Sequence, residues 1–257
     1  MSKTTQLFVF LLPFALFGLL YDSMRLLPNY MVNPIDIEGL YAAELRLFGI
    51  ATPNGLITAC EWFARHAHPV LDLAAGIFYL SWIPVPAFFA LWLHFGGHKP
   101  WALRFAWAFL CVNLIGFAGY YLYPAAPPWY VMEYGFELQV NTPGNVAGLG
   151  RFDTLTGIPI FEAMYGRNSN VFAAIPSLHS AYMVVALIYA CMSRQRWTLR
   201  LVFVVFLLGI WWTAVYSAHH YVIDVLLGIL CALVGVALFE LCLRRIPAIA
   251  RLLKKYS

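Results

Sequence analysis

The chain has 257 residues, of which 62% are hydrophobic and only 11% are charged. Soluble domains carry about 25% charged residues, so this deficit predicts an integral membrane protein. The five cysteines are an odd number, lie mostly inside apolar runs and give no disulfide framework or paired metal spacing. The net charge of +4 comes without a basic patch interleaved with aromatic residues, which excludes nucleic-acid binding.

Six apolar stretches approach the roughly 20 residues that a helix needs to cross a bilayer. They cover about residues 6–24, 70–94, 101–123, 171–192, 199–216 and 221–243. The predicted fold class is therefore an all-α integral membrane protein, a single domain over residues 1–257 with six transmembrane helices. A short flank with Lys3 and the lack of a small-residue cleavage site favour an anchor over a removed signal peptide at the first stretch. Pro84 and Pro86 are expected to kink the second.

Two long connections separate these stretches. In residues 25–69, Leu40, Ala43, Leu47 and Ile50 recur at helical spacing, which predicts either interfacial helices or a small packed cap. Residues 124–170 are rich in Gly, Pro and Asn, so they predict a loop with short interfacial helices. This loop is far longer than an ordinary connection, and long loops are often functional.

The distribution of basic residues predicts the orientation, because cytoplasmic loops carry an excess of Lys and Arg. Eleven would lie on one side: Lys3, Lys99, Arg104, Arg194, Arg196, Arg200, Arg244, Arg245, Arg251, Lys254 and Lys255. Five would lie on the other: Arg25, Arg46, Arg65, Arg151 and Arg167. Both termini are therefore predicted to be cytoplasmic. The fourth and sixth spans then both begin on the outer face, which brings His179 and His220 to one membrane depth.

The start of the sixth span carries the first candidate site. The sequence there reads Ser217-Ala218-His219-His220-Tyr221-Val222-Ile223-Asp224. Asp224 follows His220 by four residues, so on a helix the two share a face. A carboxylate in that place holds one imidazole nitrogen and leaves the other nucleophilic.

The start of the fourth span carries the second, Pro176-Ser177-Leu178-His179-Ser180. Phosphoryl transfer needs a nucleophile, an acid for the leaving oxygen and donors for the phosphate oxygens. His220 with Asp224 suits the first task and His179 the second. For phosphate binding, Ser177, Ser180 and the free N–H groups of the fourth helix are the candidates. His219 and Tyr221, beside the nucleophile, are further substrate-binding candidates, although His219 could simply line the site.

Pro-Ser-Leu-His followed by His-x-x-x-Asp resembles the second and third motifs of the type 2 phosphatidic acid phosphatase superfamily, whose members are six-helix membrane enzymes. The resemblance implies that His220 is the nucleophile, Asp224 its orienting acid and His179 the general acid. Two departures stand out near these motifs: Leu178 replaces a glycine, and Thr213-Ala214 replaces Ser-Arg. The family's first motif contains Lys and Arg-Pro, whereas here no Lys or Arg occurs between Arg104 and Arg151.

The third span instead ends in the proline-rich sequence Tyr123-Pro124-Ala125-Ala126-Pro127-Pro128-Trp129. These prolines could simply end the helix. Together with the two histidine motifs, however, they are similar to the inositol phosphorylceramide synthase branch. That resemblance implies a phosphatidylinositol-type donor, a ceramide-type acceptor and a phosphohistidine intermediate, with no metal or cofactor. Arg151 and Arg167, the basic residues of the long outer loop, are the candidates for neutralising the phosphate.

Two rival functions stay open. A lipid phosphate phosphatase acting on a phosphatidic acid-type or prenyl phosphate would use the same histidines with water as acceptor. A non-catalytic lipid transporter could use the same fold. The expected location is a bacterial inner membrane with the site facing the periplasm, with a Golgi-type membrane and a lumenal site as the alternative.

Overall fold

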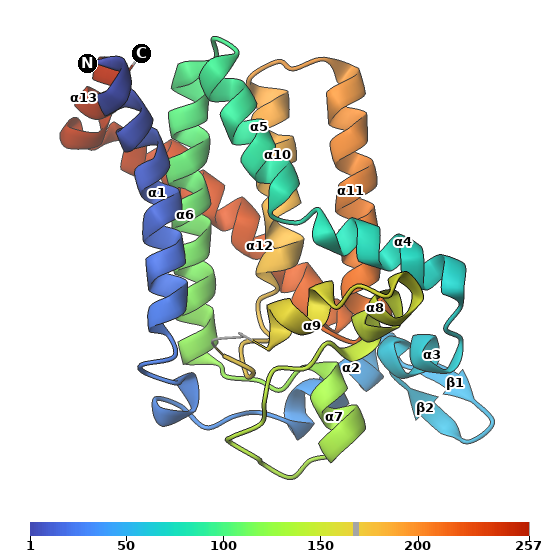
Figure 1. The fold of residues 1–257 in the computed structure, drawn as a ribbon. Coiled ribbons are helices and arrows are strands. Elements are labelled where there is room, and N and C mark those ends of the chain that lie inside the picture. Colours follow the sequence, from blue (N-terminus) through green and yellow to red (C-terminus); the bar gives the residue numbers. More distant parts are fainter. Residues whose placement is uncertain (167–169, 257) are drawn as a thin grey trace.

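The computed structural model describes residues 1–166 and 170–256. Figure 1 shows an all-helical bundle whose N- and C-termini lie at one end and whose long connections form a cap at the other. Within the described residues, five helical segments are long and apolar enough to cross a membrane: Lys3–Ser23, Pro69–Phe95, Lys99–Leu122, Trp197–Tyr216 and Val222–Arg245. Their outer surfaces carry large apolar side chains such as Phe8 and Phe88, which are 66% and 71% exposed and suit contact with lipid.

Four of the predicted spans correspond to helices with nearly the expected bounds. They are α1 (Lys3–Ser23), α6 (Lys99–Leu122), α11 (Trp197–Tyr216) and α12 (Val222–Ala237). The last continues through η3 (Leu238–Cys242) and η4 (Leu243–Arg245) and is followed by α13 (Pro247–Tyr256). The carboxylate of Glu240 in η3 binds Arg104 of α6 in a two-bond ion pair, at 3.0 and 2.5 Å.

The predicted second span, 70–94, is two helices rather than one kinked helix. They are α4 (Pro69–Leu80) and α5 (Pro84–Phe95), and Figure 1 shows α4 running across the foot of α5. Pro84 is in the first turn of α5, where its missing N–H costs no hydrogen bond. The proline therefore starts a helix instead of bending one.

The predicted fourth span, 171–192, is helical only from α10 (Leu178–Met192) onward. Ser177 is the N-cap residue, and its hydroxyl accepts a hydrogen bond from the Ser180 N–H at 3.4 Å. At 15 residues α10 is about 22 Å long, shorter than the roughly 30 Å of a hydrocarbon core. The first turn of α10, which carries His179, therefore lies between the two ends of the longer helices beside it.

Small residues bring the central helices into close contact, as is common between membrane helices. A Cβ atom on Gly228 of α12 would lie 2.1 Å from the carbonyl oxygen of Ser177. Likewise, a Cβ on Gly116 of α6 would lie 2.5 Å from the Leu178 side chain. Both glycines hold the start of α10 against its neighbours, and the Leu178 side chain is buried in the space that Gly116 leaves.

The cap is a packed layer formed by both long connections. The first contains η1 (Asn29–Met31), α2 (Glu38–Phe48), the antiparallel hairpin β1 (Ile50–Thr52) and β2 (Gly55–Ile57), and α3 (Ala59–Arg65). The second contains α7 (Pro128–Tyr134), η2 (Ala147–Leu149), α8 (Gly150–Thr156) and α9 (Ile160–Tyr165). The predicted apolar stripe on α2 is wrong in part, since Leu47 is 61% exposed while Glu44 is fully buried.

The proline-rich sequence after α6 joins three parts of this cap. The Ala125 N–H donates to Phe172 O at 3.1 Å, and the Ala126 N–H donates to Asp36 O at 2.9 Å. The Trp129 N–H donates to Ala218 O at 2.9 Å. Because the prolines cannot continue α6, the backbone leaves the helix extended and binds segments from the first connection, the second connection and the His219–His220 loop.

Candidate active site

His220 and Asp224 meet at the start of α12. The Asp224 side chain is fully buried, and its Oδ2 accepts a hydrogen bond from the Tyr221 N–H at 2.9 Å. Nδ1 of His220 lies 3.5 Å from the same oxygen. This distance is within ion-pair reach and longer than an ordinary hydrogen bond. The carboxylate thus faces one imidazole nitrogen and leaves Nε2 for other contacts.

His179 lies on the other side of His220. Its Nδ1 is 3.1 Å from His220 Nε2. The ring of Trp82 packs edge-on against the His179 ring, with centroids 4.3 Å apart, and the Tyr79 ring lies 5.1 Å away. These aromatic contacts fix the orientation of His179, so the two imidazoles face each other across one hydrogen-bonding distance.

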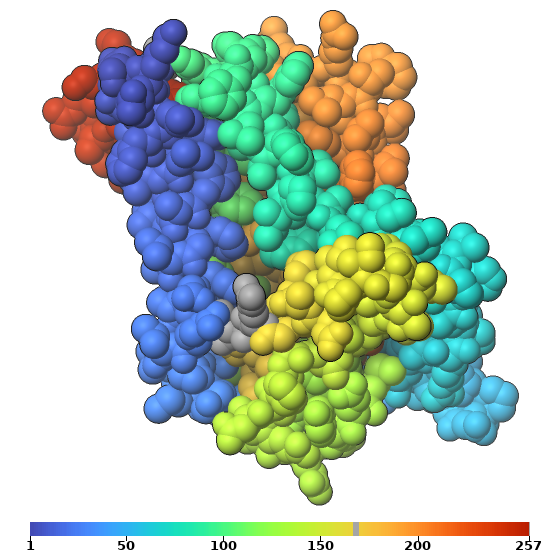
Figure 2. Space-filling model, in the orientation of Figure 1, coloured from blue at the N-terminus to red at the C-terminus, as the bar shows by residue number. Residues whose placement is uncertain are grey.

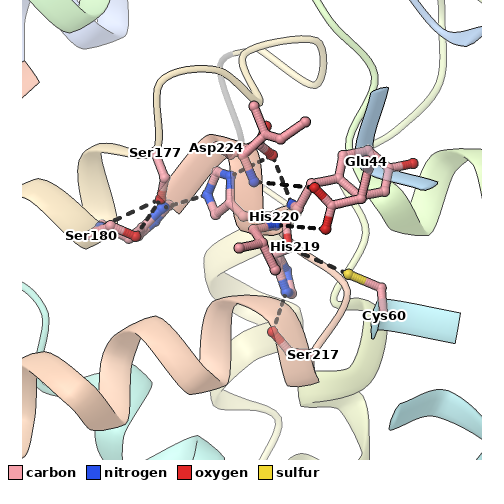
Figure 3. Close-up of polar contacts among 12 residues, drawn as sticks. Glu44, Cys60, Ser177, Ser180, Ser217, His219, His220 and Asp224 are labelled. Atoms are coloured by element: carbon pink, nitrogen blue, oxygen red, sulfur yellow. Dashed lines mark hydrogen bonds and ion pairs between the residues drawn. The ribbon is translucent and has the colours of Figure 1, made fainter. Parts of the chain in front are cut away.

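The backbone positions these groups directly. The Ser177 N–H donates to the Asp224 carbonyl oxygen at 3.0 Å, which ties the start of α10 to the start of α12. The N–H groups of His219 and His220 both donate to Ala214 O, at 3.1 and 3.0 Å. Figure 3 shows Ser177 and Ser180 on one side of His220, and Glu44 and Cys60 of the cap on the other.

Ser177 and Ser180 bond to each other, with 3.1 Å between their hydroxyl oxygens. Both side chains are fully buried, and neither borders the cavity described below.

His219 faces a different environment from His220. Its Nδ1 lies 2.9 Å from the Ser217 hydroxyl, and its Nε2 is buried without a hydrogen-bond partner in the described part of the chain. Burial, and then the neighbouring His220, lower the pKa of His219 to about 3. His219 is therefore neutral near pH 7 and offers hydrogen bonding rather than charge.

The remaining phosphate-binding candidates are Arg151, Tyr221 and Arg167. Arg151 is ion-paired through Nε with Asp72 Oδ1 at 2.6 Å, and the Tyr216 hydroxyl donates to the same oxygen at 2.7 Å. One terminal guanidinium nitrogen, Nη2, has no partner among the residues that the structure describes. The Tyr221 side chain is buried in the cap, and Arg167 lies outside the described residues.

Glu44 is a residue of this site that the sequence did not reveal. From α2 in the cap, its two carboxylate oxygens accept hydrogen bonds from the backbone N–H groups of Val222 and Ile223, at 3.0 and 3.1 Å (Figure 3). Burial raises the pKa of Glu44, an effect that the two N–H donors oppose. Glu44 thus occupies the N-terminus of α12, where unpaired N–H groups favour an anion. Nearby, Cys60 of α3 donates its S–H to the His220 carbonyl oxygen at 3.4 Å.

A cavity of about 340 Å³ opens onto the histidines. His179, His219 and His220 contribute its polar wall. Its apolar walls come from α1, the α4–α5 turn, α6, α9 and α10, including Phe17, Ile83, Phe117, Met164 and Leu178. Figure 2 shows a hollow between α1 and the α5 and α9 regions, with α6 and α10 behind it. The cavity thus combines a wall of three histidines with apolar walls that suit lipid tails.

The apolar helices are those of an integral membrane protein. Residues 50–238 match the family described as PAP2 superfamily, and the chain belongs to this family. More particularly, it is 58% identical over 253 residues to the phosphoinositol dihydroceramide synthase of Bacteroides thetaiotaomicron, covering 98% of this chain and 83% of that protein. The resemblance inferred from the motifs is thereby confirmed, and the chain is an enzyme of lipid head-group transfer.

Two fungal proteins are more distant. The chain is 32% identical over 243 residues to the inositol phosphorylceramide synthase of Candida albicans, covering 92% of this chain. It is 30% identical over 243 residues to the catalytic subunit of the Saccharomyces cerevisiae enzyme, covering 88% of this chain. The chain spans 48% and 54% of these two proteins. No solved structure matches the chain significantly.

Proposed function

We propose that the chain transfers phosphoinositol from a phosphatidylinositol-type lipid to the hydroxyl of a ceramide-type lipid. The observation that carries this proposal is the 3.1 Å approach of His179 Nδ1 to His220 Nε2, on the wall of an apolar cavity and with Asp224 behind His220. The names of the bacterial and fungal relatives support the choice of substrates.

The first half of the reaction forms a phosphohistidine. Asp224 keeps the His220 proton on Nδ1, so Nε2 carries the lone pair. His179, which carries a proton on both ring nitrogens when it acts as the acid, then donates through its own Nδ1, the nitrogen that faces His220. His220 Nε2 attacks the phosphorus, and the bond from phosphorus to the diacylglycerol oxygen breaks. The proton of His179 passes to that oxygen, so diacylglycerol leaves as a neutral alcohol.

The second half reverses these roles. His179, now without its Nδ1 proton, takes the proton of the ceramide hydroxyl. The ceramide oxygen attacks the phosphorus, and the bond from phosphorus to His220 Nε2 breaks. Both histidines return to their starting protonation states, so the cycle is balanced without any further reactant.

The charges of the site favour a phosphodiester over a phosphomonoester. A diester carries one negative charge and a monoester nearly two. Here the charge of Arg151 is already paired with Asp72, and His219 is neutral. A dianion would remain under-neutralised in a site of low dielectric. Phosphatidylinositol therefore fits better than phosphatidic acid.

The orientation of the site belongs to the same proposal. The basic residues predicted to be cytoplasmic lie on the termini and on the short α5–α6 and α10–α11 connections, and Figure 1 shows these at one end. The histidine site is at the other end. Both termini are thus cytoplasmic and the site faces the periplasm of a bacterial inner membrane.

The test offers purified protein phosphatidylinositol and phosphatidic acid, each with and without ceramide, and follows the products by mass spectrometry. With ceramide we expect inositol phosphorylceramide and diacylglycerol to accumulate in equal amounts over many turnovers. Without ceramide, we expect at most one diacylglycerol per enzyme molecule, from formation of the phosphohistidine. Release of inorganic phosphate from phosphatidic acid without a ceramide-dependent product would instead identify a phosphatase. Uptake of lipid without any product would identify a transporter.

A further inference from the structure

A second, larger cavity lies at the end of the molecule away from the histidines. It is a groove of about 1020 Å³ between α5 and α11, which Figure 1 shows upright on either side of α10. Phe89 and Phe203 form its floor, both 3% exposed and with ring centroids 5.0 Å apart. Its lining shares no residue with the cavity at the histidines.

The walls of the groove are apolar and exposed. Phe88, Trp92 and Phe95 of α5 are 71%, 60% and 72% exposed, and Val202 of α11 is 46% exposed. Such a surface suits a hydrocarbon chain, which packs against aromatic side chains without losing a hydrogen bond.

The end of the groove near the termini is cationic. Arg194 and Arg196, from the α10–α11 connection, line it together with His98. Both arginines are exposed, and neither has an ion pair or a hydrogen bond through its side chain among the described residues. Between them, Gln195 accepts a hydrogen bond from the Trp92 indole at 3.4 Å. The unpaired guanidinium groups of Arg194 and Arg196 therefore lie at the end of the apolar groove, near the end of the helix bundle.

The surroundings do not neutralise these cations. The parts of the chain at this end carry eleven Lys and Arg and a single acidic residue, Glu240. Glu240 is already bound by Arg104 and Arg244. A ligand of the groove must therefore supply the negative charge itself. A zwitterionic lipid brings its own cation, whereas an anionic lipid offers uncompensated charge.

We propose that this groove binds an anionic glycerophospholipid of the surrounding bilayer. One acyl chain lies between α5 and α11, and the phosphate lies against Arg194 and Arg196. Basic pockets between membrane helices recognise anionic head groups in this way, and guanidinium groups bind phosphate oxygens in paired hydrogen bonds. The site is separate from the head-group transfer site and does not depend on its substrates.

The test measures lipid retention by native mass spectrometry, comparing phosphatidylglycerol with phosphatidylcholine of the same acyl chains. We expect the unaltered protein to retain phosphatidylglycerol preferentially. The Arg194→Gln/Arg196→Gln variant should bind it about 25-fold more weakly, since each basic side chain contributes about fivefold. The control Arg251→Gln/Lys254→Gln removes the same charge from exposed positions of α13 and should change binding less than twofold.

A second variant tests the apolar part with all charges in place. Val202→Trp fills the groove and should also weaken phosphatidylglycerol retention. Thermal unfolding in detergent shows whether each variant is folded. If Arg194→Gln/Arg196→Gln and Arg251→Gln/Lys254→Gln weaken phosphatidylglycerol binding equally, the lipid is attracted to the whole basic end of the molecule. That result would overturn the proposed site. Retention of the lipid by Val202→Trp at the level of the unaltered protein would overturn it as well.

Discussion

Nδ1 of His179 lies 3.1 Å from Nε2 of His220, although the two residues begin different helices, α10 and α12. The contact depends on how closely these helices approach, because the backbone of Ser177 bonds the backbone of Asp224 and Gly228 leaves room for it. The two imidazoles therefore contact each other through the nitrogens to which the proposed reaction assigns the nucleophile and the acid. A phosphate that reacts with both has to take the place of this contact.

The variants His220→Ala and His179→Ala should lose different steps of the reaction. His220→Ala removes the nucleophile, so no donor should form a covalent intermediate. His179→Ala removes only the acid and should slow turnover of the natural lipid by about 10²- to 10⁴-fold. A nitrophenyl phosphoinositol donor, whose leaving group needs no proton, should restore a rapid first step in His179→Ala alone. The measurement is the burst of nitrophenol in both variants.

The neighbouring histidine provides the control for this assignment. His219→Ala should still form the covalent intermediate, because His219 faces Ser217 and has no carboxylate in the place of Asp224. A covalent intermediate in His220→Ala but none in His219→Ala would show that the nucleophile is His219.

Asp224→Asn should reduce kcat on the order of 10⁴-fold, as in serine proteases that lose the acid of the triad. The Tyr221 N–H and His220 Nδ1 both face Oδ2, so an amide oxygen in that place keeps both contacts but loses the negative charge. The imidazole then lacks the charge that stabilises it when Nε2 bonds to phosphorus. Turnover and thermal unfolding are measured together. A variant with normal kcat, or one that is merely unfolded, would contradict this role.

The sequence predicted the histidine pair because topology alone constrains it. Two motifs, each at the start of a span that enters from the same face, have to lie at similar depth. The structure agrees and adds the contact between His179 and His220. The start of the fourth helix was harder to predict, because the apolar run that begins at residue 171 continues into α10 without interruption. The helix begins only after Ser177, which is its N-cap residue.

Glu44 shows what the sequence could not reveal. Glu44 follows Leu40 by four residues and so shares its helix face, but the partners of this glutamate are backbone N–H groups with no sequence signature. Arg151 is similar, since its partner Asp72 lies in a separate helix and neither residue forms part of a motif. Long-range pairs of this kind depend on the fold of the cap, which apolar periodicity does not define.

Gly228→Ala should disrupt the site through the packing of α10 against α12. A Cβ atom there would lie 2.1 Å from Ser177 O, so the helices must separate, at a cost of about 1–3 kcal/mol. We expect a lower unfolding temperature and a loss of turnover. Gly18→Ala in α1 is the matched control, because nothing lies within 4 Å of its added Cβ. Similar behaviour of both variants would contradict the importance of the contact.

The proposed orientation predicts the labelling of two new cysteines. Asn54→Cys is in the β1–β2 turn of the cap, and Thr198→Cys is near the start of α11. Both are made after replacing the exposed Cys191 and Cys242 with serine. An impermeant maleimide should label position 54 in intact cells and position 198 only after permeabilisation. The reverse pattern would place the histidine site in the cytoplasm.

Glu44→Gln should lower kcat by about 100-fold with a smaller change in KM. The carboxylate accepts from Val222 and Ile223 with one oxygen each, whereas the amide offers one acceptor and turns its NH₂ group toward an N–H donor. The start of α12 should therefore shift, and displacements of about 1 Å at reacting atoms can cost 10²-fold. Glu38→Gln, an exposed acid in the same helix, is the matched control and should leave kcat unchanged. If Glu44→Gln lowers only the unfolding temperature, with kcat per folded molecule intact, then Glu44 stabilises the cap without positioning His220.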